Sequence, residues 1–349
     1  MKICHVLWGL AYGGIETMVS NIANVQAAEG HEVSMLVIND LVDSPMLDMI
    51  DPKVNVVFVG RPKSSKNPWH VLKANLLLFK LSPDIVHFHH PALRRLFIKP
   101  IIRSECNTLH SECIPSISGL VRKLNNLCAI SQYVHDDILQ QTGHESTVIE
   151  NGIVVNRYRH RSDWFDGNRQ FRILQLGRVD ISVKGQDIFV KAVKEVIDNG
   201  IAVSCDIIGE GHSLPELKTL IAQLGLNDRV SLLGAKSQEY VREHLADYDL
   251  VVHPSRHEGF GLVIVEAMAA KVPTLVSDIE SQLELIDHGD CGYSFKNEDV
   301  HDMANKIQQI ISNYDIKLIH LAYKRVNSEY HVERTAQEYL SYYAKVVQL

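Results

Sequence analysis

Short apolar runs rich in β-branched residues alternate with helix-length amphipathic segments along almost the whole chain. In the first half these runs cover Lys2–Leu7, Glu32–Asn39, Val54–Val59, Asp84–Phe88, Ile101–Asn107, Leu127–Ser131 and Thr147–Glu150. In the second half they cover Arg172–Leu176, Ala202–Ile208, Val230–Leu233, Leu250–Pro254 and Thr274–Ser277. Strands that alternate with helices are typical of parallel sheets covered by helices on both faces. The pattern therefore predicts an α/β fold built from two such series.

A polar, turn-rich stretch at residues 156–168 separates the two series of strands. Such a composition is typical of an interdomain linker, and 349 residues are enough for two domains with sizeable cores. We therefore expect a Rossmann-like domain at residues 1–160 and a second one at residues 161–330. A last helical run at residues 331–349 follows them.

Glycines and charged residues stand where the predicted strands end. They are Gly13-Gly14-Ile-Glu16, Gly177-Arg178, Gly209-Glu-Gly211 and Glu258. Ligands of parallel α/β sheets bind at the carboxyl ends of the strands. The sequence therefore predicts that these motifs converge on one cleft between two facing domains.

The segment Glu258-Gly-Phe-Gly-Leu-Val-Ile-Val-Glu266 is the most specific of these motifs. It joins a strand-like run to a helix that begins near Leu262, so free backbone N–H groups face an incoming anion. Helix side chains lean toward the N-terminus, which lets Glu266 reach back to the same opening. The motif predicts a phosphate on the backbone amides and a sugar hydroxyl on each carboxylate.

Two cations follow the strand Arg172–Leu176. Arg178 comes directly after Gly177, and Lys184 lies six positions later, before Gly185 and a helical run. A planar guanidinium fork and a point charge placed together suit a diphosphate.

These motifs, in this order, resemble the retaining GT-B glycosyltransferases of the family 4 group, over nearly the whole chain. The resemblance implies two facing Rossmann-like domains, an interdomain cleft and a C-terminal helix that crosses back onto the N-terminal domain. It also implies a nucleotide-sugar donor. Glu266 is then expected on the ribose and Glu258 on the donor sugar, with the backbone amides of Gly261, Leu262 and Val263 on the phosphates.

The remaining site residues also take their roles from this resemblance. Gly14 is expected against the phosphates from the opposing domain. Arg178 and Lys184 are expected to stabilise the charge that develops on the diphosphate as the glycosidic bond breaks. His110, which follows the fifth predicted strand, is expected to face the donor sugar.

The resemblance implies transfer of a sugar, with retention, from a nucleotide sugar to a glycan or lipid-linked glycan. A UDP-sugar is the expected donor. A hexosyl or N-acetylhexosaminyl group and a role in bacterial-type surface polysaccharide synthesis are expected. An epimerase or phosphorylase on the same fold, and a noncatalytic sugar-nucleotide-binding protein, remain as alternatives.

Two patterns raise the question of a metal. Asp247-Tyr-Asp249 matches a metal-binding DxD pattern, but it precedes a strand and so belongs to the edge opposite the cleft. His87 and His89 share one strand face, which allows a metal pair, although no third ligand lies at tight spacing. We therefore expect no metal and no cofactor beyond the nucleotide-sugar substrate.

Charge and composition narrow the partners. The net charge of −7 is uneven, because residues 1–160 hold 15 Lys and Arg against 14 Asp and Glu, and the rest holds 20 against 28. An acidic chain argues against general nucleic-acid binding. Leu93–Arg103 mixes cations with bulky apolar residues, which suits contact with an anionic membrane; a helix face followed by a core strand is the alternative.

The expected location is the cytoplasm, with peripheral contact on the inner face of the cell membrane. No apolar run approaches the roughly 18 residues of a membrane span. Met1–Leu7 leads directly into a strand pattern, without the features of a signal peptide. The six cysteines show no CxxC spacing, which is typical of free thiols in a reducing compartment.

Overall fold

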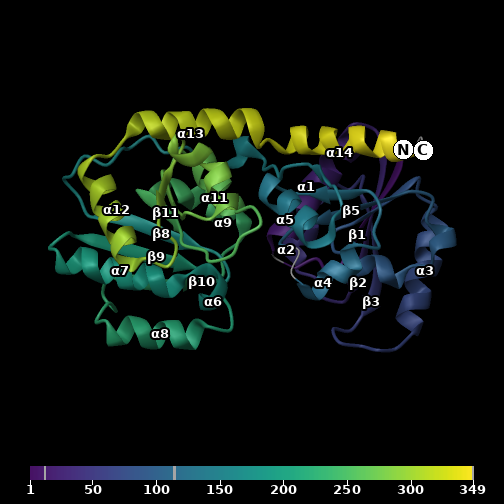
Figure 1. The fold of residues 1–349 in the computed structure, drawn as a ribbon, viewed down its shortest axis with the longest axis horizontal. Coiled ribbons are helices and arrows are strands. Elements are labelled where there is room, and N and C mark those ends of the chain that lie inside the picture. The colour runs from purple at the N-terminus through teal and green to yellow at the C-terminus, as the bar shows by residue number, and fades with distance from the viewer. Residues whose placement is uncertain (12, 113–114, 348–349) are drawn as a thin grey trace. The chain divides into compact units, whose positions relative to one another are not determined.

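The computed structural model of the chain describes residues 1–11, 13–112 and 115–347. The chain folds into two compact units, an N-terminal unit of Met1–Ile153 with Tyr330–Leu349 and a C-terminal unit of Val154–Glu329 (Figure 1). Residues 154–160, expected in the first domain, thus fall in the C-terminal unit. The reason is local packing: the 3₁₀ turn η3 (Val155–Arg157) lies against α10 (Leu262–Ala269), and the Arg159 amide donates to the Arg242 carbonyl at 3.0 Å.

The N-terminal unit is built on a seven-stranded parallel sheet in the order β3-β2-β1-β4-β5-β6-β7. Its strands are β1 (Lys2–Leu7), β2 (Glu32–Asn39), β3 (Asn55–Arg61), β4 (Ile85–Phe88), β5 (Glu105–Leu109), β6 (Leu127–Ala129) and β7 (Thr147–Val148). Its helices are α1 (Gly14–Ala28), α2 (Ser44–Asp48), α3 (Trp69–Leu81), α4 (Pro115–Val121), α5 (Gln132–Thr142) and α14 (Val332–Val347). The strand order reverses between β1 and β4, which is the usual ligand position in such sheets.

The C-terminal unit is built on a six-stranded parallel sheet in the order β10-β9-β8-β11-β12-β13. Its strands are β8 (Phe171–Leu176), β9 (Val203–Ile208), β10 (Val230–Gly234), β11 (Leu250–His253), β12 (Thr274–Ser277) and β13 (Tyr293–Phe295). Beside α10, its helices are α6 (Ile181–Lys184), α7 (Gln186–Asp198), α8 (Leu214–Gln223), α9 (Gln238–His244), α11 (Glu280–Leu285), α12 (Val300–Ser312) and α13 (Ile316–Glu329). Here the order reverses between β8 and β11.

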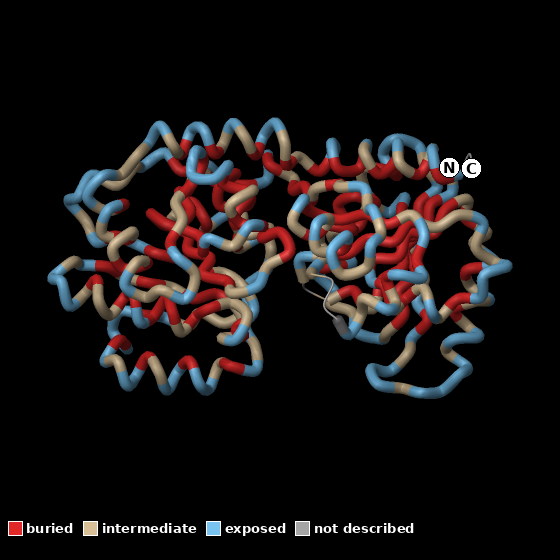
Figure 2. The backbone as a smooth tube through the Cα atoms, in the orientation of Figure 1, coloured by how far each residue is buried: buried red, intermediate tan, exposed pale blue. Residues whose placement is uncertain are grey.

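Each sheet is buried on both faces, as Figure 2 shows for the middle of each unit. The central strands β1, β2, β4, β11 and β12 are therefore buried along nearly their whole length rather than at every second residue. In the C-terminal unit Phe171, Phe189 and Phe295 belong to one core cluster, and Phe88 and Leu78 belong to a core cluster of the N-terminal unit.

Most strands differ from the predicted runs by one or two residues at an end, and two differ more. Strand β5 covers Glu105–Leu109 rather than 101–107, because Lys99–Ile101 forms a 3₁₀ turn (η2) whose apolar residues pack beside the core. Strand β13 was not indicated by the sequence pattern. It has only three residues, with the polar Ser294 at its centre, so it carries no readable apolar run.

The last helix, α14, packs on the N-terminal unit. Ile153 and the start of α14 are tied by two backbone hydrogen bonds of 2.9 Å, Ile153 N–H to the Tyr330 carbonyl and Val332 N–H to the Ile153 carbonyl. Farther along the helix, Tyr339 and Tyr343 are fully buried. The chain thus returns to its first unit after completing the second.

Two further sequence predictions concern cysteines and membrane spans. Five cysteines, at positions 4, 106, 128, 205 and 291, are free and buried, which confirms the prediction for them; Cys113 lies outside the described residues. Among the described helices, none combines the length and the apolar composition needed to cross a bilayer.

Candidate functional site

In the C-terminal unit, the loops after β8, β9 and β11 meet backbone to backbone at the carboxyl edge of the sheet. Gly209 has a φ of +147°, and a Cβ there would collide with the carbonyl oxygen of Gly177. Gly185 has a φ of +62°, and a Cβ there would collide with the carbonyl oxygen of Pro254. Glycine is required at both positions by conformation and by space. These contacts bring the segments that carry Arg178, Lys184 and Glu258 onto one edge.

Lys184 and Glu258 form the centre of this edge. The Lys184 Nζ atom donates to Glu258 Oε2 at 2.6 Å, and His253 Nε2 lies 2.8 Å from the same oxygen. Both charged side chains are less than a fifth exposed. The sequence predicted Lys184 and Glu258 as site residues but did not predict their ion pair or the buried His253 beneath it.

The electrostatic environment keeps Glu258 ionised. Burial acts to raise the pKa of Glu258, but the charge of Lys184 and the hydrogen bond from His253 outweigh it and hold the pKa well below its usual value. Burial lowers the pKa of His253, with Glu258 acting in the opposite direction. An ionised, paired carboxylate is a hydrogen-bond acceptor for a hydroxyl, not a proton donor.

Glu266 is held by two other donors. The Tyr158 hydroxyl and the Gln238 amide nitrogen donate to its Oε1 at 2.8 and 2.7 Å. Neither bond takes Oε2, so that oxygen can accept from a ligand. Burial raises the pKa of Glu266, and the two donors act against it. Tyr158 and Gln238 come from segments 108 and 28 residues away, so no local motif marks them.

The loop between the two glutamates ends at Gly261, the N-cap of α10. Its φ is +101°, a left-handed conformation that glycine adopts without strain, and it offers no capping side chain. The amides of Leu262 and Val263 open the helix, where N–H groups have no intrahelical carbonyl to bond. The positive end of α10 therefore lies beside Glu258 in the chain, as a site for an anion requires.

Arg178 stands on the same edge but is much more exposed. Its side chain is 65% exposed and lies 3.4 Å from the Asp180 carboxylate, while its backbone carbonyl accepts from Gln186 Nε2 at 2.9 Å. A loosely paired guanidinium on a fixed backbone can turn toward an anion without breaking a buried contact.

In the N-terminal unit, Gly14 is the first residue of α1 and Gly13 is its N-cap. A Cβ on Gly13 would collide with the Glu16 carboxylate, which folds back over the glycine. Burial raises the pKa of Glu16. Gly13 therefore leaves room for the Glu16 carboxylate at the start of α1.

His110 ends a chain of buried histidines in the same unit. Its Nε2 lies 3.1 Å from His89 Nδ1, His89 Nε2 lies 2.9 Å from His5 Nδ1, and His5 Nε2 lies 2.8 Å from the Gln26 side-chain oxygen. His87 lies beside this chain, with its ring nitrogens 2.6 Å from the Tyr343 hydroxyl and 2.7 Å from the Thr108 hydroxyl.

The hydrogen bonds along this chain of histidines fix which nitrogen of His110 carries the proton. Burial lowers the pKa of His110 to about 3 and of His5 to about 4, and it lowers the pKa of His89 strongly, so all three rings are neutral. With the Gln26 oxygen as acceptor, each ring must donate from Nε2 and accept at Nδ1. His110 Nδ1 is then an acceptor, and it is buried without a partner among the described residues.

The buried histidines predict that acid destabilises the N-terminal unit. Because the unfolded rings titrate near 6.5 and the folded ones near 3 to 4, the unfolded chain binds more protons in between. Stability should therefore fall as the pH drops below about 6.5, by up to about 1.4 kcal/mol per pH unit for each histidine. Urea titrations at about pH 7.5 and about pH 5.5, read by hydrogen exchange in β1 and β4, measure this.

A matched pair of variants isolates that effect. His5→Gln removes one buried ring and should flatten the pH dependence, whereas His301→Gln, at an exposed histidine, should leave it unchanged. Equal slopes for the wild type and His5→Gln would contradict the assignment.

The histidine cluster also bears on metal binding. His5, His87 and His89 place one nitrogen each within 4.8 Å of one another, so the fold supplies the third histidine that sequence spacing did not show. Hydrogen bonds already occupy both ring nitrogens of each of these histidines. The Asp247-Tyr-Asp249 carboxylates are likewise engaged, Asp247 by Arg159 and the fully buried Asp249 by Arg161 and Arg169.

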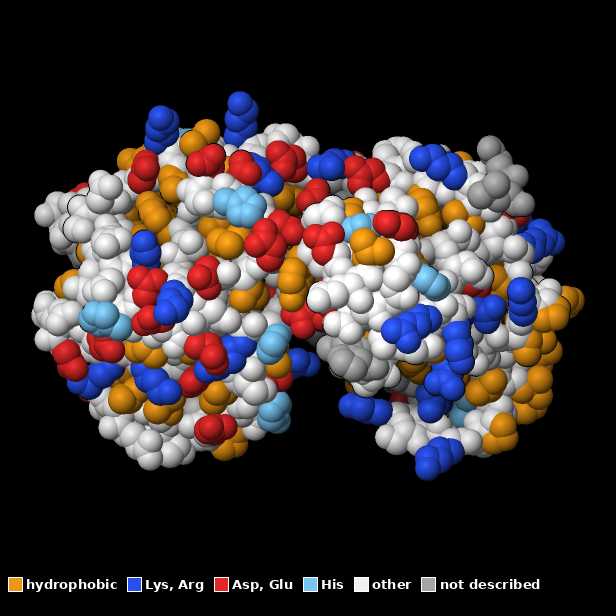
Figure 3. Space-filling view, in the orientation of Figure 1, with side chains coloured by type: hydrophobic (Ala, Val, Ile, Leu, Met, Phe, Trp, Pro, Cys, Tyr) orange, Lys and Arg blue, Asp and Glu red, His pale blue; other side chains and the backbone are white. Residues whose placement is uncertain are grey.

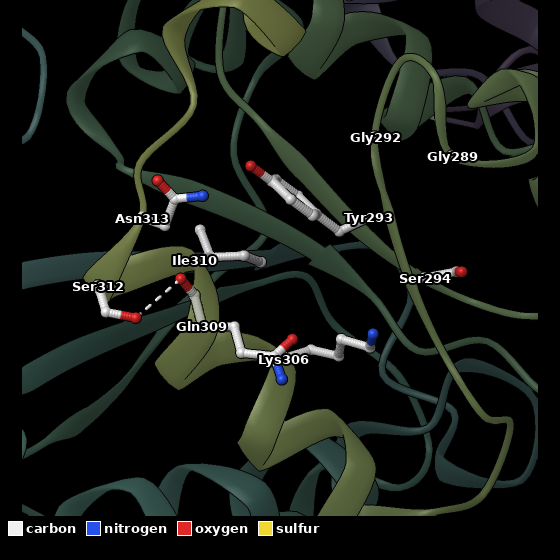
Figure 4. Close-up of a pocket in the computed structure, with 9 residues that line it drawn as sticks. All are labelled: Gly289, Gly292, Tyr293, Ser294, Lys306, Gln309, Ile310, Ser312 and Asn313. Atoms are coloured by element: carbon white, nitrogen blue, oxygen red, sulfur yellow. Dashed lines mark hydrogen bonds between the residues drawn. The ribbon is translucent and has the colours of Figure 1, made fainter.

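A pocket of about 530 Å³ lies elsewhere in the C-terminal unit, between β13 and α12. Figure 4 shows Tyr293, Lys306, Ile310 and Asn313 around it. None of the residues gathered after β8 and β11 lines this pocket. It is therefore separate from the candidate site.

Two family models together match residues 12–325. The model described as Glycosyltransferase Family 4 matches residues 12–157, and the model described as Glycosyl transferases group 1 matches residues 157–325. The chain belongs to the family 4 glycosyltransferases. The resemblance stated from the sequence motifs is confirmed.

Curated relatives of this glycosyltransferase vary in how much of the chain they match. It is 30% identical to the alpha-D-kanosaminyltransferase of Streptomyces kanamyceticus over 145 residues, 42% of this chain and only 37% of that relative. It is 25% identical over 348 residues to the GDP-mannose:cellobiosyl-diphosphopolyprenol alpha-mannosyltransferase of Xanthomonas oryzae pv. oryzae, 90% of this chain and 88% of the relative.

A solved structure supports the fold class over the full length. The complex of Anabaena Alr3699/HepE with UDP-glucose superposes with a TM-score of 0.83 at 21% identity, and the match covers 99% of this chain and 100% of that one. Two parallel Rossmann-like sheets with helices, in the GT-B class, are therefore confirmed.

Proposed function

We propose that this glycosyltransferase moves a sugar, with retention of anomeric configuration, from a UDP-sugar to a hydroxyl of a glycan or lipid-linked glycan. The sugar is a hexosyl or N-acetylhexosaminyl group, and the product belongs to a surface polysaccharide. The proposal rests on the group of residues that follows β8 and β11. Two glutamates, two cations and the N-terminus of α10 lie there at one edge of the sheet. The relatives support a nucleotide sugar as the donor, since one is solved with UDP-glucose and another is named for GDP-mannose.

The nucleotide side of the donor is assigned to α10 and its loop. Glu266 Oε2 accepts from the ribose hydroxyls, with Tyr158 and Gln238 holding Oε1 in place. The amides of Leu262 and Val263 face the phosphates, and Gly261 keeps that approach open. Gly14, the first residue of α1, is assigned to the diphosphate as the family resemblance implies.

The sugar side is assigned to Glu258 and His110. Glu258 is kept ionised by Lys184 and so accepts hydrogen bonds from sugar hydroxyls. His110 presents the unpartnered Nδ1 as an acceptor toward the sugar, because His89, His5 and Gln26 fix its proton on Nε2.

Transfer then needs no protein nucleophile. The bond between the anomeric carbon and the diphosphate oxygen breaks as the acceptor hydroxyl oxygen bonds to the same face of that carbon. The acceptor proton passes to the departing phosphate oxygen. Arg178 and Lys184 stabilise the charge left on the diphosphate, in the place that a divalent metal takes in other transferases. The proposed reaction therefore requires neither metal nor other cofactor.

The proposed location is the cytoplasmic face of the cell membrane, where lipid-linked acceptors are available. Among the relatives, the alpha-mannosyltransferase named for a diphosphopolyprenol acceptor supports this setting.

A donor screen tests the proposal. Thermal shift with UDP-, GDP- and ADP-sugars, run in EDTA, should show stabilisation by one UDP-sugar; ligand at about 100 times its Kd adds roughly 2.7 kcal/mol. Turnover of that donor with a membrane extract should survive EDTA and release UDP. A reaction that depends on phosphate and releases a sugar phosphate would instead show a phosphorylase. An isomerised sugar nucleotide would show an epimerase. Binding of the donor without turnover would show a noncatalytic protein. Loss of turnover in EDTA, restored by Mn²⁺, would contradict the cationic assignment.

A further inference from the structure

Helix α3 of the N-terminal unit is apolar on two faces. Its inner face packs on the core through the buried Ala74 and Leu78. Its outer face carries Trp69, Leu72, Leu76 and Phe79, which are 57%, 49%, 48% and 67% exposed. Single exposed leucines are ordinary, but four large side chains spaced three and four apart form one continuous helix face. A helix with a second, exposed apolar face opposite its core face is normally covered on that face by protein or lipid.

The apolar face continues onto the neighbouring turn. Asn75 accepts from the Ile98 backbone N–H at 2.9 Å and donates to the Leu96 carbonyl at 2.8 Å, which clamps this turn to α3. Ile98 is 57% exposed. Trp69, Leu72, Leu76, Phe79 and Ile98 are named here the α3 surface.

The chain segment that carries the α3 surface is rich in exposed cations, and acids are almost absent from it. Residues 52–104 contain ten Lys and Arg but a single acidic residue, Asp84, which lies 3.7 Å from Arg103. The exposed cations are Lys53, Lys63, Lys66, Lys80, Arg95, Lys99 and Arg103. Figure 3 shows hydrophobic side chains along the edge where α3 lies, with Lys and Arg beside them.

We propose that the α3 surface docks on an anionic membrane, with its apolar side chains at the level of the lipid headgroups and the surrounding cations on the headgroup charge. The proposal rests on the proposed function in one respect, because a lipid-linked acceptor would be held in the membrane on which the α3 surface docks. The evidence for the α3 surface itself comes only from its own exposure and contacts. The proposal also extends the membrane contact expected at Leu93–Arg103 onto α3 and keeps Ile98, Arg95, Lys99 and Arg103 of that segment, but not Arg94. Arg94 is ion-paired with Glu105 and only 18% exposed, so it is not a lipid-facing charge.

A second copy of this protein fits the α3 surface less well than an anionic membrane does. Self-pairing would bring two cation-rich surfaces together, and like charges across an interface oppose association. Anionic lipid neutralises the same charges and accepts the apolar side chains.

Flotation of the full chain with vesicles tests the proposal in the absence of any donor. The wild type should float with phosphatidylcholine vesicles that contain phosphatidylglycerol, and much less with phosphatidylcholine alone or in about 1 M salt, where the Debye length is about 3 Å. Leu72→Glu with Leu76→Glu should lower the partition coefficient by at least about tenfold. Lys80→Gln with Lys99→Gln should lower it by about tenfold at low salt.

Matched controls lie on the C-terminal unit. Leu321→Glu changes a leucine that is 42% exposed, and Lys317→Gln with Lys324→Gln removes the same charge from α13. Both controls should float like the wild type, and all variants should keep the thermal shift with UDP, so that this test and the donor test can fail separately.

Absence of wild-type flotation at low salt would overturn the proposal, as would equal losses in the controls. A concentration-dependent dimer abolished by Leu72→Glu with Leu76→Glu, without flotation, would show that a second copy covers the face instead.

Discussion

Replacing Arg178 by alanine is expected to lower turnover by about 100- to 1,000-fold, while the protein stays folded. A preorganised charge aimed at a developing anion typically contributes about 2.7–4 kcal/mol to lowering the barrier. Because the Arg178 side chain is 65% exposed and only loosely paired with Asp180, its removal leaves no buried charge without a partner. Initial rates at saturating donor, with circular dichroism as the check on folding, measure the effect.

Arg229→Ala is the matched control for that variant. Arg229 is an exposed arginine of the same unit, at the start of β10 and away from the carboxyl edge, and its loss should leave turnover unchanged. Near-wild-type turnover of Arg178→Ala would remove Arg178 from the chemistry.

The role of Lys184 needs a different experiment, because its charge also neutralises Glu258. Removing one partner of a buried pair costs about 3–5 kcal/mol of stability, so Lys184→Ala should lose both stability and turnover. Combining it with Glu258→Gln should restore much of the stability but not the rate. A double variant that recovers both would show that the lysine only balances the glutamate.

Glu266→Gln is expected to weaken UDP binding by about 10- to 100-fold in calorimetry. Hydrogen bonds to a charged group contribute about 1.5–3 kcal/mol, and glutamine keeps an oxygen for Tyr158 and Gln238 while removing the charged acceptor from the ribose. The glutamine variant is preferred to alanine, which would leave two donors without an acceptor.

Two companions interpret that result. Tyr158→Phe removes one of the donors that hold Oε1 and should weaken UDP binding by less than Glu266→Gln does. Glu239→Gln, at an exposed glutamate of α9, should have no effect. UDP affinity that is the same in Glu266→Gln and wild type would show that the ribose lies elsewhere.

The sequence was most informative where local rules decide the structure. The central strands were predicted because sheets covered on both faces need continuous apolar runs, and the motifs after β8, β9 and β11 were visible because glycines and charges interrupt those runs. The sequence alone therefore places Arg178 and Glu258 on one edge of the sheet.

The partners of these residues depend on pairing between distant segments. Lys184 and Glu258 are 74 positions apart, and their contact depends on Gly185 fitting against the Pro254 carbonyl. His5 stands opposite His87 only because β1 pairs with β4 in that register. No single-segment pattern contains such information, so His253, Tyr158, Gln238 and the histidine chain could not be predicted.

The return of α14 to the first unit has a consequence for synthesis of the chain. Tyr343 and Tyr339, which contact His87 and Thr108 at the centre of the N-terminal sheet, are synthesised only after the whole C-terminal unit. Domains usually fold as units in the order of their synthesis. Here the C-terminal unit can fold first, while the unit begun by β1 stays unfinished until α14 has been synthesised. A chain cut before α14 would thus carry a complete C-terminal unit and a first unit whose His87 and Thr108 lack their tyrosine partners.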